Sequence, residues 1–165
     1  MNFFYIDSSA LVKRYHREKG TDPVDALLDF LLAKKPTHLI TSMWAIPETI
    51  AALNRKKNEG KIEATQLIDI LANLLTEIDI FDTITVDEER ILGSIPYITI
   101  HNLNSSDALH LSAIKEAGEI AKYIEGTLIV ISSDKRLLKA SEDEGFKALN
   151  PEDVEINIIN ELLGS

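Results

Sequence analysis

Thr127-Leu128-Ile129-Val130-Ile131 is the stretch of sequence that decides the fold. After Thr127 it contains only β-branched and aliphatic residues, whereas a strand with one solvated face alternates apolar and polar side chains. Such a run is typical of a central parallel strand that is covered on both faces. The sequence therefore predicts a parallel sheet with helices on both sides.

Weaker runs of the same kind predict the other strands, at residues 3–6, 38–41, 80–86 and 146–149. Between them, apolar residues recur at helical spacing. Helices are expected from Ser8, from Asp22, from Pro47, through 67–75, at 87–92, at 107–117, at 135–144 and at 155–163. The helix from Pro47 and the one through 67–75 should form a hairpin. Alternation of strands and helices predicts an α/β architecture in one domain, residues 1–165.

Composition limits the kind of protein. With 45% hydrophobic residues and no Cys, the 165 residues can bury a core without disulfides and offer no thiolate ligands. No apolar run approaches the roughly 18 residues of a membrane span, and the N-terminus has no basic segment before its first acid. We therefore expect a cytoplasmic protein with no membrane partner.

The net charge of −10 argues against a nucleic-acid partner, because proteins that bind nucleic acid usually present a basic face. The electrostatic field depends, however, on the local distribution of charge. Bound divalent cations would also offset an acidic cluster that the net charge counts in full. The charge alone therefore does not decide the partner.

Ligands of parallel sheets bind at the carboxyl ends of the strands. Four acidic residues follow predicted strands or open the helices there: Asp7, Glu48, Asp107 and Asp134. Each has an alternative role as a helix cap or a first-turn acid. Paired serines beside three of these acids already supply capping hydroxyls, so Asp is not needed there to cap. Because clustered carboxylates repel each other unless a cation is bound, we expect all four to converge on a divalent cation.

An all-oxygen set of ligands selects Mg²⁺ or Mn²⁺ over zinc. Asp7 and Asp107 are expected to make the most direct contacts with the metal, and Glu48 and Asp134 to complete the site directly or through water. The hydroxyls of Ser8 and Ser132 are candidates to hydrogen-bond these carboxylates or a bound water. Helix capping is an equally good interpretation of both serines.

Four segments carry a further signal, in this order along the chain: Tyr5–Lys13, Pro47–Leu53, Ser106–Ala113 and Ile131–Leu138. They resemble the signature blocks of the PIN-domain family, especially its VapC-type toxins. The resemblance implies a three-layer sandwich with a five-stranded parallel sheet, Mg²⁺ or Mn²⁺ bound by the acidic quartet as the catalytic residues, and endoribonuclease activity on RNA. It also implies, in many members, a cognate antitoxin and a homodimer. Ser132 stands where the family commonly has Thr, which keeps the hydroxyl.

Three other functions share part of this pattern. A phosphoacceptor receiver domain also carries Asp and Mg²⁺ at strand ends, but it needs an acidic pair where only Asp7 is present. A hydrolase with an aspartyl nucleophile usually has a second Asp two residues later, where this chain has Ser9. The remaining alternative is a non-catalytic or RNA-processing RNA-binding module of the PIN type, against which the presence of all four acids argues.

Arg14, Arg55 and Lys135 are candidates for contacts with RNA phosphates, although most surface Arg and Lys side chains are merely solvated. Trp44 and Tyr97 could stack on bases, but core packing is the more usual role of a lone aromatic residue beside a strand.

His110 lies one helical turn after Asp107. A packed histidine bonded to the nearby backbone is favoured over a proton shuttle. The hairpin between Pro47 and Glu77 has more apolar helix surface than one side of a sheet needs, so part of it is expected to contact a second copy or an antitoxin segment.

Overall fold

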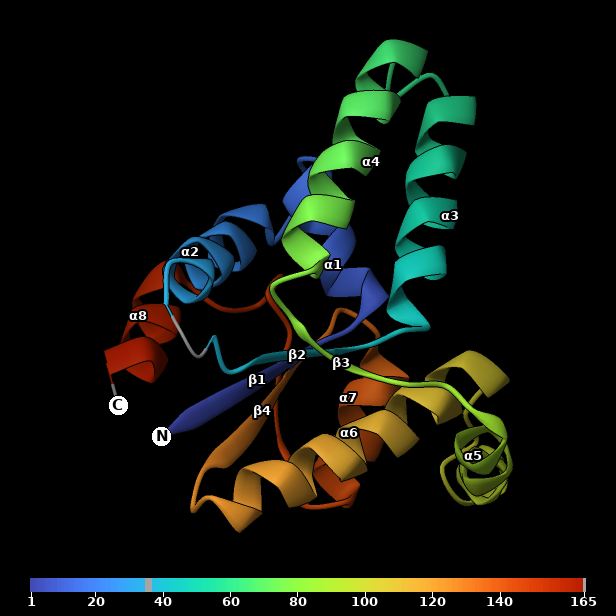
Figure 1. Cartoon of the computed structure of the whole chain (residues 1–165), viewed down its shortest axis with the longest axis vertical. Helices are drawn as coiled ribbons and strands as arrows, with labels where there is room; N and C mark the ends of the chain where they lie inside the picture. The colour runs from blue at the N-terminus through green and yellow to red at the C-terminus, as the bar shows by residue number, and fades with distance from the viewer. Residues whose placement is uncertain (35–36, 165) are drawn as a thin grey trace.

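The computed structural model describes residues 1–34 and 37–164. Its five strands form an all-parallel sheet in the order β3-β2-β1-β4-β5 (Figure 1). The strands are β1 (Asn2–Ile6), β2 (Leu39–Ser42), β3 (Asp82–Ile84), β4 (Thr127–Ile131) and β5 (Lys147–Leu149). The parallel sheet expected from the sequence is confirmed, and its five strands match the number that the family resemblance implies.

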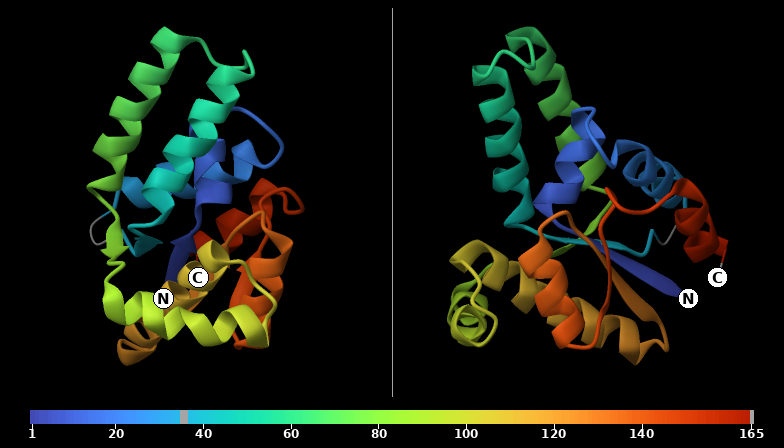
Figure 2. Two further views of the ribbon diagram at one scale, coloured as in Figure 1. Left: turned by 90° about the vertical axis from the view of Figure 1, so that its right-hand side faces the viewer. Right: turned by 180° about the vertical axis from the view of Figure 1, so that it is seen from behind.

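The helices form a layer on each face of this sheet. They are α1 (Ser8–Tyr15), α2 (Thr21–Leu32), α3 (Ala45–Asn58), α4 (Ala64–Ile78), α5 (Glu88–Ile100), α6 (Ser105–Tyr123), α7 (Lys135–Asp143) and α8 (Ile156–Gly164). Figures 1 and 2 show α1, α2 and α8 on one side of the sheet and α5, α6 and α7 on the other. The hairpin of α3 and α4 packs against α1 and projects away from the sheet. None of the helices in the described ranges combines the length and apolar character needed to cross a membrane.

The central strand β1 contributes to the core on both faces. Phe4 and Ile6 pack in the core beneath α1, α2 and α8, whereas Phe3 and Tyr5 pack in the core beneath α6. Burying side chains of this size contributes about 1.5–3 kcal/mol each to folding. β4 is buried from Leu128 to Ile131 and pairs with β1 and β5, as the uninterrupted apolar run predicts.

The order of the strands places a switch point beside β1. From β1 the chain passes to β2 and β3 on one side, whereas β4 and β5 lie on the other side. Helices leave the carboxyl ends of β1 and β4 in opposite directions at such a switch point, which is where ligands of open α/β sheets bind. The backbone N–H of Asp7 donates to the carbonyl of Ile131 at 3.2 Å, so the residues that follow β1 and β4 lie side by side.

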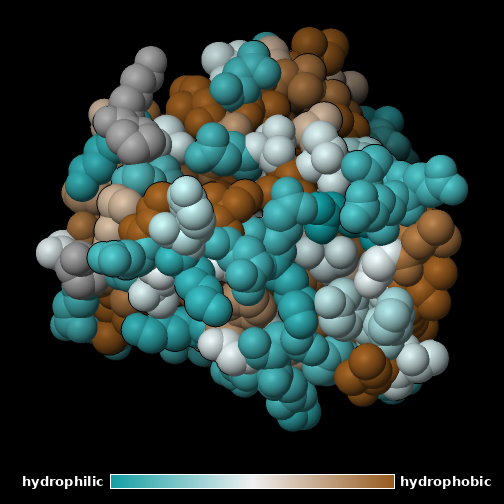
Figure 3. All heavy atoms as spheres, turned by 60° about the horizontal axis from the view of Figure 1, so that its bottom comes forward, coloured by the Kyte–Doolittle hydropathy of each residue, from teal (hydrophilic) through white to brown (hydrophobic). Residues whose placement is uncertain are grey.

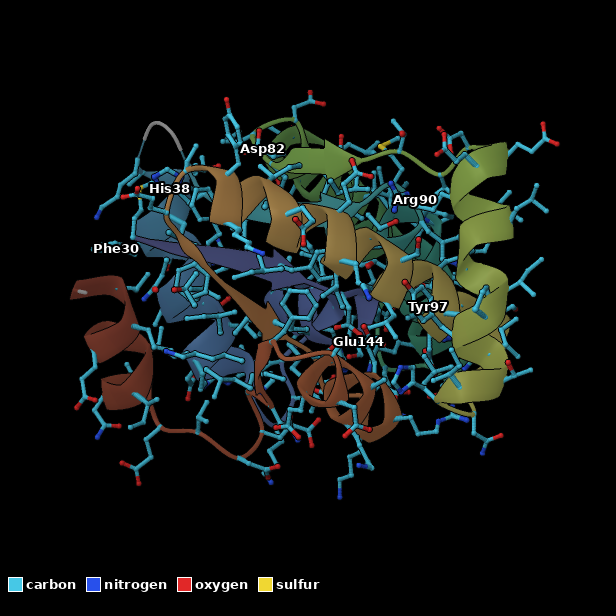
Figure 4. All side chains as sticks on the ribbon, turned by 90° about the horizontal axis from the view of Figure 1, so that it is seen from below. Phe30, His38, Asp82, Arg90, Tyr97 and Glu144 are labelled. Carbon is cyan, nitrogen blue, oxygen red and sulfur yellow. The ribbon has the colours of Figure 1, made fainter. Side chains whose placement is uncertain are left out.

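Two helices are longer than the sequence indicates. α5 extends to Ile100 instead of Leu92, and α6 runs from Ser105 to Tyr123 instead of 107–117. Pro96 lies inside α5, where proline removes a backbone hydrogen bond. α5 packs along α6, and the Arg90 guanidinium in its first turn donates to the carbonyls of Thr85 and Ser112 at 2.8 and 2.9 Å. Figure 4 shows Arg90 and Tyr97 turned toward α6.

Candidate functional site

Asp7 is the N-cap of α1 and is 3% exposed. Its Oδ1 accepts the backbone N–H of Ala10 at 3.0 Å and the hydroxyl of Ser9 at 2.8 Å. Its Oδ2 accepts the hydroxyl of Ser132 at 2.8 Å. Burial raises the pKa of Asp7 above its ordinary value, even though these donors favour the ionised form.

Asp134 is the N-cap of α7. Its Oδ1 accepts the backbone N–H groups of Arg136 and Leu137 at 2.8 and 3.2 Å. The backbone N–H of Asp134 donates to the Ser132 hydroxyl at 3.0 Å, so this one buried serine connects Asp134 with Asp7. The expectation that serine hydroxyls make aspartate caps unnecessary is therefore wrong. The two aspartates cap the helices, and the serine hydroxyls bind carboxylates.

Asp107 is the third residue of α6, which is capped by Asn104. The backbone N–H of Asp107 donates to Asn104 Oδ1, and Asn104 Nδ2 donates to Asp107 Oδ2, both at 2.8 Å. Burial, together with the negative charges of Asp134 and Asp7, raises the pKa of Asp107 to about 6. The Arg136 guanidinium lies beside two of these acids, with Nη2 3.5 Å from Asp107 Oδ2 and Nε 3.9 Å from Asp134 Oδ1.

Glu48 lies in the first turn of α3 and is held by three side-chain donors. Its Oε2 accepts the Ser8 hydroxyl at 2.9 Å and His110 Nε2 at 2.7 Å, and its Oε1 accepts the Ser106 hydroxyl. Burial opposes its ionisation, but the hydrogen bonds and the charge of His110 leave the pKa of Glu48 below its ordinary value. The protein therefore favours the ionised form of Glu48, in contrast to Asp7 and Asp107.

His110 is 2% exposed, so the expectation that it is packed inside the protein is correct. The expected backbone partner is wrong. Its two ring nitrogens face side chains, Nε2 toward Glu48 and Nδ1 toward the Tyr5 hydroxyl at 2.8 Å. Burial opposes a charge on this ring, but the hydrogen bond to Glu48 and the charge of Asp7 raise the pKa of His110.

A sequence model of the PIN domain matches residues 4–143. The chain belongs to the PIN-domain family. The resemblance of the four sequence segments to this family is thereby confirmed. PIN domains are generally nucleases, and PIN nucleases generally use divalent metal ions.

Solved structures share the fold of this PIN domain. PAE2754 from Pyrobaculum aerophilum has 15% identity and a TM-score of 0.66, covering 99% of this chain and 90% of its own. FitAcB from Neisseria gonorrhoeae has 14% identity and a TM-score of 0.60, covering 92% and 100%. FitAB bound to an IR36 DNA fragment has 15% identity and a TM-score of 0.59, covering 93% and 98%. No curated protein sequence matches the chain. Identities this low establish a shared fold only.

The acids of this PIN domain are close enough for their charges to interact, but they do not form a ready coordination sphere. Within residues 1–34 and 37–164, no group of three or more His, Asp or Glu side chains is arranged to hold a metal ion. The candidate ligands nevertheless fit a hard divalent cation, because the side chains at this edge of the sheet offer carboxylate and hydroxyl oxygens. The raised pKa values of Asp7 and Asp107 show that their negative charge is incompletely compensated. Asp7, Asp107 and Asp134 are the residues that could share such a cation.

The basic candidates differ in their surroundings. Arg14 forms ion pairs with Asp25, Asp29 and Glu77 at 3.2, 2.7 and 2.8 Å, which tie α1 to α2 and α4. Its guanidinium therefore already pairs with carboxylates within the fold. Arg55 and Lys135 are exposed. Arg136, which is not among the sequence candidates, is the guanidinium that lies beside Asp107 and Asp134.

The two aromatic candidates occupy different places. Trp44 is 39% exposed, and its indole N–H donates to the Ser106 hydroxyl at 2.6 Å, so the expectation of core packing is wrong for this residue. The exposed indole ring of Trp44 thus lies beside Ser106, whose hydroxyl donates to Glu48. Tyr97 is half-buried between α5 and α6, in agreement with core packing.

Proposed function

We propose that this PIN domain is a metal-dependent endoribonuclease that hydrolyses RNA phosphodiester bonds with Mg²⁺ or Mn²⁺, in the cytoplasm, as the toxin of a toxin–antitoxin pair. The observation that carries this proposal is the accumulation of negative charge at the switch point of the sheet. Burial, followed by the charges of Asp134 and Asp7, raises the pKa of Asp107 to about 6, although Arg136 and His110 act in the opposite direction. A bound divalent cation would relieve the repulsion between these carboxylates. Acids with a purely structural role would not need to be gathered in this way.

Asp7, Asp107 and Asp134 would hold the cation, and Glu48 would complete the site from the first turn of α3. When bound, the cation supplies activation of a water molecule and stabilisation of charge on the phosphoryl oxygens. The chain itself contributes orientation: Ser132 and Ser9 fix Asp7, and Asn104 fixes Asp107. Arg136 and Trp44 stand beside the acids, where they could meet a phosphate and a base of a single strand.

Cleavage of a single-stranded or looped RNA tests the proposal. The wild-type protein should cut only when Mg²⁺ or Mn²⁺ is supplied, and EDTA should abolish cleavage. The products should carry a 5′-phosphate, because water and not the ribose 2′-hydroxyl is the nucleophile. Asp7→Asn should lower the rate by orders of magnitude, on the scale of several kcal/mol of transition-state stabilisation.

Asp69→Asn provides the matched control, since Asp69 is exposed on α4 and its substitution removes the same charge away from the site. This variant should cut at the wild-type rate. Metal-independent products with a 2′,3′-cyclic phosphate would contradict the mechanism, and cleavage of single-stranded DNA but not RNA would contradict the substrate. RNA binding without any cleavage would favour the alternative function, a non-catalytic RNA-binding module.

A homodimer and an antitoxin partner also belong to this proposal, and the structure changes the surface that we assign to the dimer. α4 exposes Ile68 and Leu75, whereas α5 exposes a larger set: Ile91, Leu92, Ile95, Ile98 and Ile100. Figure 3 shows hydrophobic side chains at the right-hand edge, the side on which α5 lies in Figure 1. Contiguous apolar surface of this kind marks protein interfaces. We therefore assign α5, and not the α3–α4 hairpin, to the contact with a second copy.

A further inference from the structure

Three buried or half-buried side chains connect the central strand with the candidate site. Nδ1 of His110 lies 2.8 Å from the Tyr5 hydroxyl oxygen, and Nε2 of the same ring lies 2.7 Å from Oε2 of Glu48. Tyr5 is 0% exposed and His110 is 2% exposed. Hydrogen bonds that are shielded from water in this way hold both edges of the ring in place.

The roles of donor and acceptor follow from the chemistry of the groups. The ionised carboxylate of Glu48 can only accept, so His110 Nε2 carries the proton of that bond. Nδ1 then faces the Tyr5 hydroxyl, which donates to it when the ring is neutral. Tyr5, which is anchored in β1 two residues before Asp7, thereby keeps the Nε2–H group of His110 directed at Glu48.

The Glu48 carboxylate has little freedom to reorient. A carboxylate offers about four lone-pair sites, and Ser8, Ser106 and His110 donate to three of them. These donors come from α1 and α6, which lie on opposite faces of the sheet, so rotation of the carboxylate would break several bonds at once. About one acceptor position remains for any other partner of Glu48.

We propose that His110, held by Tyr5, is a positioning residue that keeps the Glu48 carboxylate in one orientation and leaves it a single position with which to meet a cation or a cation's water ligand. The proposal rests on the proposed function, in which Glu48 belongs to the cation site. This role accounts for the hydrogen bonds that Glu48 accepts from Ser106 and His110 of α6. Asp7 and Asp134 are instead connected to each other through Ser132.

Titration of Mn²⁺ into the metal-free protein by calorimetry tests this role without turnover. His110→Leu removes the donor to Glu48 while filling the buried space, and its Kd for Mn²⁺ should rise about tenfold, the scale seen when a group that orients a metal ligand is lost. His110→Gln returns an N–H group near the position of Nε2 and should bind within about threefold of wild type. With RNA, His110→Leu should lower kcat and leave KM unchanged.

Leu111→Ala provides the control for a merely structural role. Leu111 is the next residue on α6 and is fully buried, but it packs in the core and has no part in holding Glu48. Its substitution should destabilise the fold and leave the Kd for Mn²⁺ unchanged. In combination with Glu48→Gln, His110→Leu should have little additional effect, because a residue that acts through Glu48 is not additive with it. Wild-type Mn²⁺ affinity in His110→Leu, or an equal loss in Leu111→Ala, would overturn the proposal.

Nitrogen-15 NMR of the metal-free protein separates this proposal from the proposed function. The His110 ring should show a protonated Nε2 whose resonance moves on Glu48→Gln and on Tyr5→Phe. If wild type binds no Mn²⁺, the proposed function fails, and these spectra alone then test whether Tyr5 and His110 position Glu48. An Nε2 resonance that neither substitution moves would overturn it.

Discussion

Replacing Asp107 by Asn tests the electrostatics of the site in the metal-free protein. Burial and the charges of Asp134 and Asp7 raise the pKa of Asp107 from 3.8 to about 6. The folded state therefore binds this proton more tightly than the unfolded state does, and stability falls as the pH rises between these two values. The destabilisation is absent below about pH 4 and fully present above about pH 6.

The expected size follows from the shift. About two pH units at 1.36 kcal/mol each would give about 3 kcal/mol, and screening of the carboxylate charges by the nearby solvent and by Arg136 reduces this to about 1–2 kcal/mol. Asn keeps the oxygen that accepts from Asn104 Nδ2 and removes the charge. The Asp107→Asn protein should therefore be more stable than wild type by about 1–2 kcal/mol at pH 7, and this difference should shrink toward pH 4.

Urea unfolding with EDTA present, at several values between pH 4 and pH 8, measures the difference in free energy of unfolding between variant and wild type and its dependence on pH. Only the difference between variant and wild type is compared, since other groups also titrate in this range. Asp69→Asn, on the exposed surface of α4, should show no comparable gain. An Asp107→Asn protein that is less stable than wild type at pH 7, or a difference that does not change with pH, would refute the reasoning.

Three other substitutions test separate parts of the structure. Arg136→Gln removes the positive charge beside Asp107 and Asp134, so calorimetry should show tighter Mn²⁺ binding. Weaker binding would contradict the assignment of the cation to these two acids. Arg14→Met removes the cation that three carboxylates share, of which Glu77 keeps the Tyr15 hydroxyl as a donor, and should lower the free energy of unfolding by about 1–3 kcal/mol. The folded variant should bind RNA like wild type; selective loss of RNA binding would identify Arg14 as a phosphate contact. Ile95→Lys on α5 should give monomers in sedimentation experiments, whereas Ile68→Lys on α4 should remain dimeric; a wild-type protein that is monomeric at high concentration would rule out the dimer.

The class of fold could be predicted from the sequence because it depends on local patterns. The uninterrupted Thr127–Ile131 run requires burial on both faces, and parallel strands with helical crossovers satisfy that requirement. The position of each acid relative to its strand is also a local property, readable for Asp7 and Asp134. Helix ends are less readable from the sequence: α5 continues past Pro96 to Ile100 and packs against α6, a long-range contact that local propensity does not contain.

Only the tertiary structure decided which groups surround each carboxylate. Ser132 meets Asp7 across 125 positions in the sequence, and His110 meets Glu48 across 62, because the strand order and the packing of α6 bring them together. The same packing uses Arg14 within the fold and places Arg136 beside the acids. Residue type and local pattern set what each side chain can do, but a hydrogen bond needs its partners within about 3 Å, and only the packed fold sets that distance.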